Sequence, residues 1–207
     1  MDIKELEAAL AQANADYRNC DVDTRAAAEV TVYELERKLA AAKGEAYATT
    51  LDFPVRWDVG APMPHVFANE HWVFLTFLVA DSPMIPTEPV SLTYAVVEFL
   101  RPVAHRSGSP SEDDQFGHYL CGRGQEIYRA QIVENSAWLR EMIDMWKKAN
   151  LEDDDSDEKH WQQRIKHYIF WFHDSTFECL ARGYEVHTYH DTINAVVEKI
   201  IKRLLKG

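Results

Sequence analysis

The stretch His167-Tyr-Ile-Phe-Trp-Phe-His-Asp-Ser-Thr-Phe-Glu-Cys-Leu-Ala-Arg182 is the most apolar and aromatic run of the chain. It also carries His173, Asp174 and Glu178 near its centre. Its alternation of side chains predicts two antiparallel strands that meet at a tight turn, Asp174-Ser175. The stretch therefore predicts a hairpin in the core of an antiparallel sheet, with a polar site on one of its faces.

A period of two residues divides the side chains of this hairpin between two faces. The face expected in the core is aromatic and apolar and holds Tyr168, Phe170, Phe172, Phe177, Cys179 and Ala181. The opposite face holds His167, Ile169, Trp171, His173, Thr176, Glu178 and Leu180. With Asp174-Ser175 as the turn, His173 faces Thr176 and Trp171 faces Glu178. His173 and Glu178 then lie on one diagonal, within reach of each other.

The pair formed by His173 and Glu178 suits a general base and the carboxylate that orients it, because the carboxylate fixes the imidazole tautomer and raises its basicity. Glu98 is a third catalytic candidate, since a charge in an apolar strand is costly unless it is paired or lies near an opening. Trp171 and Thr176 are the candidate ligand-binding residues beside the pair. The alternative is a buried, mutually satisfied polar pair that only fixes the strand register.

Metal binding is a second alternative. His187 and His190 offer two nitrogen ligands, with Asp191 next to them, and predict a site for zinc or another divalent ion. Two histidines three residues apart at a predicted strand–helix junction are much less specific than the helical HExxH pattern. The sequence names no cofactor.

Nucleophilic catalysis has weaker candidates. Ser175 is not surrounded by a GxSxG motif, and Cys179 lies on the apolar face, where its thiol would be held neutral and unreactive. Cys121 follows His118 in a glycine-rich segment and is expected to be more accessible.

Composition limits the class of protein. The 207 residues are 46% apolar, which is enough for one globular core. A net charge of −12 and a pI near 5.2 argue against nucleic acid and anionic membranes as partners. The acidic run Glu152-Asp-Asp-Asp-Ser-Asp-Glu158 is predicted to be a solvated loop, and the negative charge favours a protein partner with a basic surface.

Three features predict a cytoplasmic protein. The three cysteines are widely spaced and form no CxxC motif, which favours reduced thiols over a disulfide framework. The charged N-terminal segment does not resemble a signal peptide. No apolar run reaches the roughly 18 residues that a membrane span needs.

Residues 1–45 are predicted to form a helical hairpin. The first helix has an apolar stripe of Ile3, Leu6, Leu10, Ala13 and Tyr17. The second is expected to begin at Asp23 or Thr24 and to end before Gly44. Its seam is thin and rich in alanine, so the hairpin must pack either on the main body or on a second copy in a homodimer.

Residues 46–207 are predicted to form an α+β domain with a mainly antiparallel sheet of five to seven strands, packed with helices. Strands are expected at 53–59, 71–79, 92–100 and 127–133, and a long surface loop at 105–117. A helix capped by Asn135 or Ser136 should place Trp138, Met142, Met145 and Trp146 on one buried face. A closing helix should begin after Asp191 and cover the sheet.

The segment from His167 to Cys179, preceded by Val133-Glu-Asn-Ser-Ala-Trp138, resembles segments of an uncharacterised bacterial protein family. The resemblance covers the second half of the chain and excludes the N-terminal helical segment. It implies no activity, cofactor or partner.

The sequence as a whole favours an acidic protein-interaction or small-ligand-binding module of an accessory or immunity type. The alternatives are a hydrolase-like enzyme that uses His173 and Glu178, or a metalloprotein that uses His187 and His190.

Overall fold

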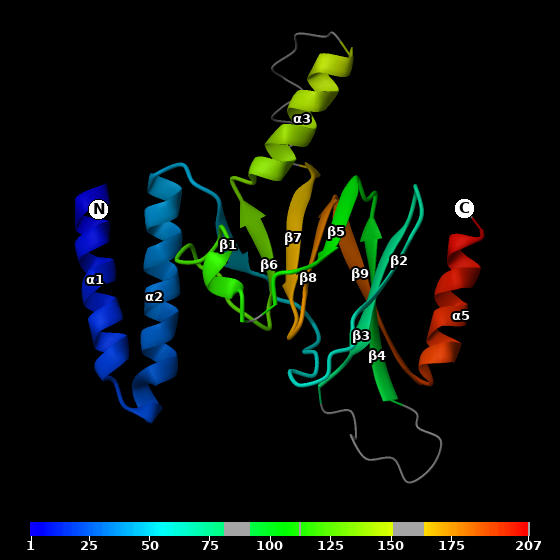
Figure 1. Ribbon diagram of the computed structural model, residues 1–207, viewed down its shortest axis with the longest axis horizontal. Helices are drawn as coiled ribbons and strands as arrows, with labels where there is room; N and C mark the ends of the chain where they lie inside the picture. The colour runs from blue at the N-terminus through cyan, green and yellow to red at the C-terminus, as the bar shows by residue number, and fades with distance from the viewer. Residues whose placement is uncertain (81–91, 112, 151–163, 207) are drawn as a thin grey trace.

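The computed structural model describes residues 1–80, 92–111, 113–150 and 164–206 (Figure 1). They contain two antiparallel sheets, which confirms the predicted α+β class with an N-terminal helical hairpin. The strands are divided between these two sheets, whereas the sequence predicted a single sheet. The first has the order β1-β6-β7-β8-β5, formed by Tyr47–Thr50, Ala130–Glu134, Lys166–Trp171, Thr176–Ala181 and Ala104–Gly108. The second has the order β2-β3-β4-β9, formed by His65–Ala68, Val73–Leu78, Leu92–Leu100 and Gly183–Asp191.

The main core lies between the two sheets, where the apolar face of the β7–β8 hairpin meets alternate residues of β3 and β4. Ring centroids of Phe99 and Phe177 are 5.3 Å apart, and Phe53 contacts Phe170 edge-on at 5.3 Å. Burial of so many aromatic rings stabilises the contact between the sheets. The predicted core face of the hairpin is therefore confirmed, and each sheet keeps an outer face that points away from this core.

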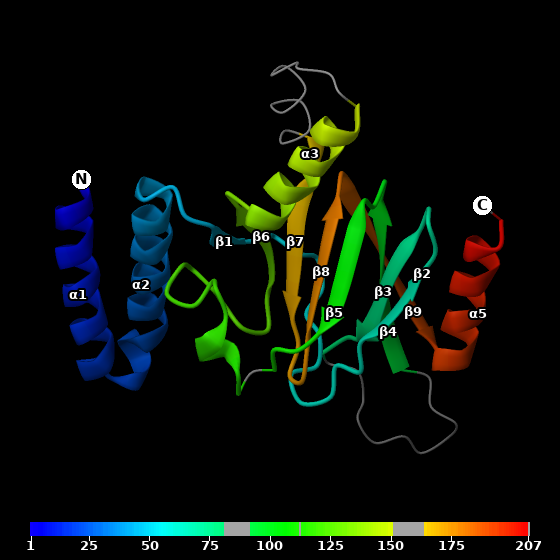
Figure 2. The same ribbon diagram turned by 45° about the horizontal axis from the view of Figure 1, so that its top comes forward.

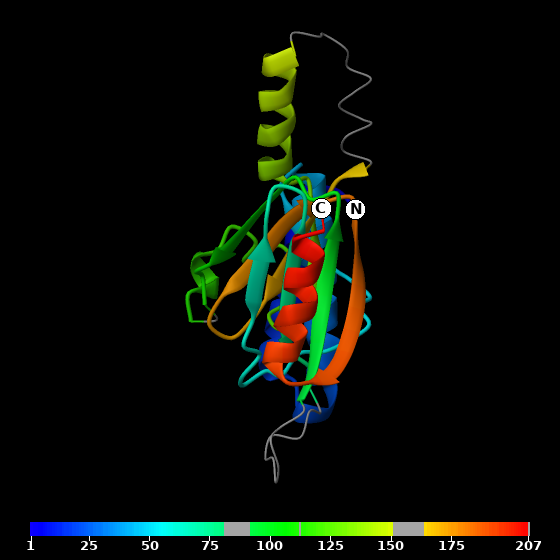
Figure 3. The same cartoon turned by 90° about the vertical axis from the view of Figure 1, so that its right-hand side faces the viewer.

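Helices cover parts of both outer faces. Helix α5 (Ile193–Leu204) packs Val196 and Ile200 on the outer face of the four-stranded sheet (Figure 3). Helix α3 (Ala137–Asn150) packs Leu139 and Ile143 on the five-stranded sheet and then projects beyond it (Figure 3). Met145 is 52% exposed, so its predicted place on the buried face of this helix is wrong.

The N-terminal hairpin consists of α1 (Ile3–Asn19) and α2 (Val22–Ala42) and lies at the opposite end of the molecule from α5 (Figure 2). Its two helices pack on each other, and α2 is tied to the first sheet by Arg37, whose Nε donates to the Ala48 carbonyl at 2.8 Å. The hairpin thus docks on its own chain. Asp21, not Asp23 or Thr24, caps α2, while Gly44 adopts the predicted left-handed conformation with φ of 69°.

Three predicted elements differ from the structure. A strand was expected at residues 53–59, but the segment has only an isolated bridge, in which Trp57 pairs with Val79. The predicted loop at 105–117 contains most of β5 and a short 3-10 helix, η1 (Gln115–Gly117). Strand β9 extends to Asp191, so Thr192 caps α5 in place of Asp191. The predicted loop at 81–89 and the acidic run at 152–158 lie outside the described residues.

Among the described residues, no helix combines the length and the apolar character that a membrane crossing requires.

Candidate functional site

A buried polar cluster on the outer face of the five-stranded sheet is centred on Glu178 of β8, which is 5% exposed. Its carboxylate accepts a pair of hydrogen bonds from Arg106 of β5, from Nε at 2.8 Å and from Nη2 at 2.7 Å. It also accepts from His167 Nε2 at 2.8 Å and from the Tyr119 hydroxyl at 3.4 Å. Such a paired arginine contact is directional and stronger than a neutral hydrogen bond. Glu178 is therefore held in one orientation.

The cluster continues from His167 to the start of α3. His167 Nδ1 lies 2.8 Å from Ser136 Oγ, and the same oxygen accepts the backbone N–H of Leu139 at 3.1 Å. An ionised carboxylate can only accept, so the proton of a neutral imidazole is on Nε2 and points to Glu178. Nδ1 is then an acceptor, and the Ser136 hydroxyl donates to it. The result is a hydrogen-bonded chain from Ser136 through His167 to Glu178.

Strand register brings these residues together. Arg106 is directly opposite Glu178 in the β5–β8 pair, while Ile169 is opposite Glu178 in the β7–β8 pair. His167 lies two residues along β7 from Ile169, on the same face, and reaches Glu178 diagonally. Asn135, with φ of 51°, turns the chain from β6 into α3 and leaves Ser136 at the first turn of the helix. Ser136 thus fulfils the predicted capping role.

Burial and pairing set the charges of the cluster. Burial favours the neutral form of Glu178, but hydrogen bonds from His167 and Arg106 outweigh it and lower the pKa of Glu178 to about 2. Burial lowers the pKa of His167 despite the opposing influence of Glu178. The hydrogen bond to Glu178 raises the pKa of Arg106. At neutral pH the cluster therefore contains an ionised carboxylate, a guanidinium and a neutral imidazole.

Aromatic side chains cover this cluster. Trp138 of α3 meets the His167 ring edge-on at 5.1 Å and lies 4.6 Å from the Arg106 guanidinium carbon. On the other side, His118 packs edge-on against Trp171 at 4.7 Å, and burial lowers the pKa of His118 to about 4. These contacts restrict the access of water to Glu178, which strengthens its hydrogen bonds.

A pocket of about 340 Å³ opens beside the Ser136 end of the chain. Ser136 and His167 form part of its wall, Leu139 and Ile165 supply apolar surface, and Arg140 and Lys166 are exposed cationic residues of the lining. Its volume falls in the range of small-molecule sites. The polar chain thus ends at a cavity and not in solid core.

The predicted pairing of His173 with Glu178 is wrong. The backbone N–H of Phe172 donates to Ser175 at 2.9 Å, so the turn is centred on His173 and Asp174, one residue earlier than predicted. This change moves the register by two residues, and Trp171 is opposite Thr176. A shift of two preserves the faces, so Glu178 keeps its predicted face. His173 lies in the turn, half exposed, with Nδ1 at 2.7 Å from an Asp174 carboxylate oxygen.

The two candidate ligand-binding residues, Trp171 and Thr176, are both buried and face each other across β7 and β8. Thr176 Oγ1 is 3.5 Å from the carbonyl of Gly108. Neither residue belongs to the lining of the pocket beside Ser136.

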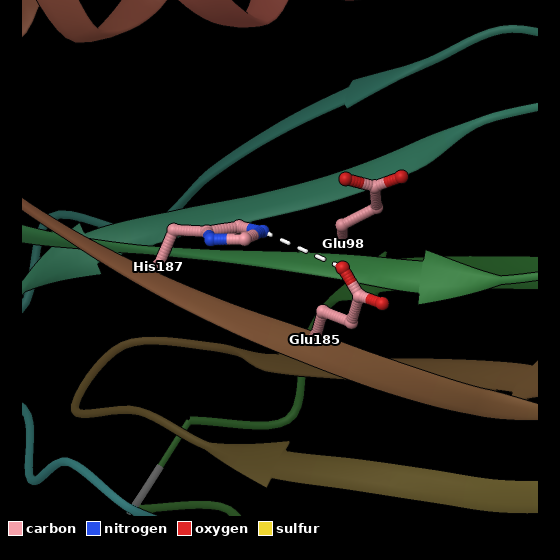
Figure 4. A group of neighbouring side chains, drawn as sticks. All are labelled: Glu98, Glu185 and His187. Carbon is pink, nitrogen blue, oxygen red and sulfur yellow. Dashed lines mark ion pairs between the residues drawn. The ribbon is translucent and has the colours of Figure 1, made fainter.

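The remaining candidates lie on the other sheet. Glu98 is on the outer face of β4, opposite Glu185 of β9 (Figure 4). Glu178 belongs to the five-stranded sheet. His187 is on the same face as Glu98, whereas His190, three residues further along the strand, is on the other face with its Nδ1 3.3 Å from Thr93 Oγ1. His187 and His190 therefore cannot share one ion. The structure does not bring the three predicted catalytic residues together.

Four residues of the cluster were not predicted as site residues, namely His167, Ser136, Arg106 and Tyr119, and the first two have a sequence signal. His167 was placed on the same hairpin face as Glu178, and only the register concealed the contact. Ser136 was predicted as a cap but not as a partner of His167. Arg106 gave no usable signal, because the polar segment around it was predicted to be a loop.

Comparisons of the chain with protein-family models, with curated proteins and with solved structures find no match.

Proposed function

We propose that this protein binds a small ligand in the pocket at the start of α3. One observation carries the proposal: the pocket wall includes Ser136 and His167, which are the end of the buried hydrogen-bonded chain from Glu178. A ligand site typically combines an apolar cavity with a few fixed polar groups. Leu139 and Ile165 supply the apolar surface here, and the hydrogen-bonded Ser136–His167 pair supplies the fixed polar groups.

The charge around the pocket favours an anionic ligand, such as a small carboxylate or phosphate. Arg140 and Lys166 contribute two positive charges to the lining, against one negative charge from Glu134. The pocket lies at the start of α3, and a helix N-terminus favours negative charge. The ligand is expected to accept hydrogen bonds from Arg140 and Lys166.

Ligand-induced thermal stabilisation of the full chain tests this proposal. Among a panel of small carboxylates and phosphates, at least one is expected to raise the Tm of the wild type. Arg140→Ala should reduce that shift, because it removes a cation of the pocket. Arg18→Ala, which removes an exposed arginine of α1, is the matched control and should leave the shift unchanged. Equal shifts in all three proteins, or none in the wild type, would contradict the proposal.

Hydrolysis through Ser136 is the second candidate function, favoured by the two 2.8 Å contacts that join Ser136, His167 and Glu178. A hydroxyl next to a neutral imidazole, itself oriented by a carboxylate, is the arrangement of an activated nucleophile. Ser136 Oγ would form the new bond to the electrophile while His167 Nδ1 takes the hydroxyl proton. The helix N-terminus beside it is suited to stabilise developing negative charge.

A fluorophosphonate probe tests this second candidate. The Ser136 oxygen would bond to phosphorus, fluoride would leave, and the proton would pass to His167. Intact-mass spectrometry should then show one adduct per chain, located at Ser136. Ser136→Ala should abolish the adduct and His167→Asn should slow its formation, while Ser175→Ala, in the β7–β8 turn, should have no effect. Absence of labelling in the wild type would reject hydrolysis and leave ligand binding to its own test.

We also propose a protein partner with a basic surface, a homodimer through α1 and α2, and a cytoplasmic location. The net charge of −12 supports the first. Val30 is 56% exposed on α2 and gives a second copy an apolar contact point. Sedimentation velocity tests the homodimer: the wild type should sediment as a dimer and Val30→Glu as a monomer.

A further inference from the structure

Three metal-ligating side chains converge on the outer face of the four-stranded sheet, away from the pocket at α3. Glu98 of β4 is directly opposite Glu185 of β9, and His187 follows two residues later on the same face (Figure 4). One carboxylate oxygen from each glutamate and one ring nitrogen of His187 lie within 4.8 Å of one another. Figure 4 shows the three side chains on the same side of the sheet.

Two atoms of this group are buried without a hydrogen-bond partner among the described residues. Glu98 is 2% exposed, and Arg203 of α5 donates to its Oε1 at 2.7 Å, but its Oε2 has no donor. His187 Nε2 is also buried without a hydrogen-bond partner; it lies 3.7 Å from Glu185 Oε2, which is within ion-pair distance but longer than a hydrogen bond. A buried acceptor without a partner costs roughly 1–3 kcal/mol, so the arrangement implies an additional group.

The chemistry of the three atoms identifies the kind of group. Carboxylate oxygens and an unprotonated imidazole nitrogen all offer lone pairs, and a single cation satisfies lone pairs from several sides at once. Imidazole favours first-row transition ions, while Mg²⁺ and Ca²⁺ prefer ligand sets made of oxygen alone. At the ligand atoms themselves, two carboxylates face the single guanidinium of Arg203.

We infer that Glu98, Glu185 and His187 bind one divalent first-row transition ion, such as Zn²⁺. Ligand atoms about 2.0–2.2 Å from one ion are separated by no more than about 4.4 Å, so the group must contract slightly on binding. The side chain of Glu185 is half exposed and free of the constraints of the core, and it can make that movement. The neighbouring cavity of about 260 Å³ provides space for the remaining ligands of the ion; Glu98 and His187 line it, together with Arg203 and three lysines, Lys199, Lys202 and Lys206.

This site differs from the pair that the sequence predicted, because Glu98 and Glu185 replace His190. It is also independent of the proposed ligand pocket, which is on the other sheet. Failure of one proposal therefore leaves the other unaffected.

Calorimetric titration of the metal-free full chain with zinc chloride tests the inference. The wild type is expected to bind one equivalent at this site. Glu185→Gln and His187→Gln should each weaken that binding at least tenfold, and both residues are exposed enough to be replaced without loss of the fold. Circular dichroism of each variant verifies its folding before the titration.

His190→Gln is the matched control, because His190 belongs to the same strand but points from the opposite face. It should bind zinc with the affinity of the wild type. Absence of stoichiometric binding in the wild type would overturn the inference. So would wild-type affinity in both Glu185→Gln and His187→Gln, or loss of the site in His190→Gln.

Discussion

Glu178 and Glu98 occupy equivalent places in the two sheets, yet their surroundings differ. Each is nearly buried on the outer face of a strand that has a neighbour on both sides, and each accepts from one arginine. Glu178 receives two bonds from Arg106 and further bonds from His167 and Tyr119. Glu98 receives one bond from Arg203, and its second oxygen has no donor among the described residues.

The number of donors decides whether hydrogen bonding outweighs burial, which favours the neutral form of both glutamates. Burial raises the pKa of Glu98, and the opposing effect of Arg203 is too small to reverse it. For Glu178, the donors outweigh burial and lower the pKa to about 2. Two glutamates that are equally buried therefore differ. Glu178 is a stable, fully hydrogen-bonded carboxylate, whereas Glu98 has one oxygen without a hydrogen-bond donor. The first suits a rigid support for a site, and the second suits a ligand to a cation.

Replacing each glutamate by glutamine should give the largest contrast. Glu178→Gln should reduce the free energy of unfolding at pH 7 by about 3 kcal/mol, since a pKa lowered from 4.5 to about 2 corresponds to that amount. Glu98→Gln should cost much less or even stabilise the protein, because burial already favours the neutral form of Glu98. Urea denaturation measures both values. A cost for Glu98→Gln equal to or above that for Glu178→Gln would contradict the comparison.

The pH dependence of stability should have opposite signs at the two sites. The folded pKa of Glu178 is below its unfolded value, so its contribution is present above pH 4.5 and is lost as the pH falls towards 2. The folded pKa of Glu98 is raised, so its contribution is present at low pH and is lost as the pH rises through that pKa.

Urea titrations from pH 5 to pH 2 therefore should show a shallower loss of stability for Glu178→Gln than for the wild type. Glu98→Gln should show a loss as steep as that of the wild type or steeper. A shallower loss for Glu98→Gln would show that its pKa shift has the wrong sign.

Ser136 tests whether the chain of hydrogen bonds is more than a helix cap. Ser136→Ala should lower stability by about 1 kcal/mol through loss of the cap. Ser136→Asn should restore most of that stability, because asparagine also caps helices. It should not restore fluorophosphonate labelling. Recovery of both properties would be incompatible with a specific role for the serine hydroxyl.

The smallest effect is expected at His173. His173→Ala should change stability by no more than about 0.5 kcal/mol, because the side chain lies half exposed in a turn. A double-mutant cycle with Glu178→Gln should give a coupling near zero for His173 and above about 0.5 kcal/mol for His167→Asn, which contacts Glu178 directly. A larger coupling to Glu178 for His173 than for His167 would instead support the strand register that the sequence predicted.

The fold class followed from the sequence because its signals are local. The alternation in residues 167–182 identified the core face, and Gly44 marked the end of α2. Strand β5 was missed because His105, Arg106 and Ser107 are polar and exposed at an edge of the sheet, where the apolar alternation is absent. The division into two sheets depends on pairing between distant segments, which periodicity does not encode.

The site was only partly predictable for the same reason. Glu178 was identified, because a charge in an aromatic strand is conspicuous in any register. Its partners were not identified. Because the turn lies one residue earlier than predicted, His167 and not His173 is the diagonal neighbour of Glu178. Arg106 lies 72 residues away in sequence, and Ser136 lies 31 residues from His167. Contacts at such separations come from the topology and have no local signature.

The central claim is that ionised Glu178 orients a neutral His167, which in turn accepts from Ser136 at the edge of a pocket. Nitrogen-15 NMR of the histidine side chains at pH 7 tests it most directly, with His167→Asn used for assignment. The account predicts an His167 ring with its proton on Nε2 and a bare, hydrogen-bonded Nδ1. A doubly protonated ring, or a proton on Nδ1 with a bare Nε2, would contradict it.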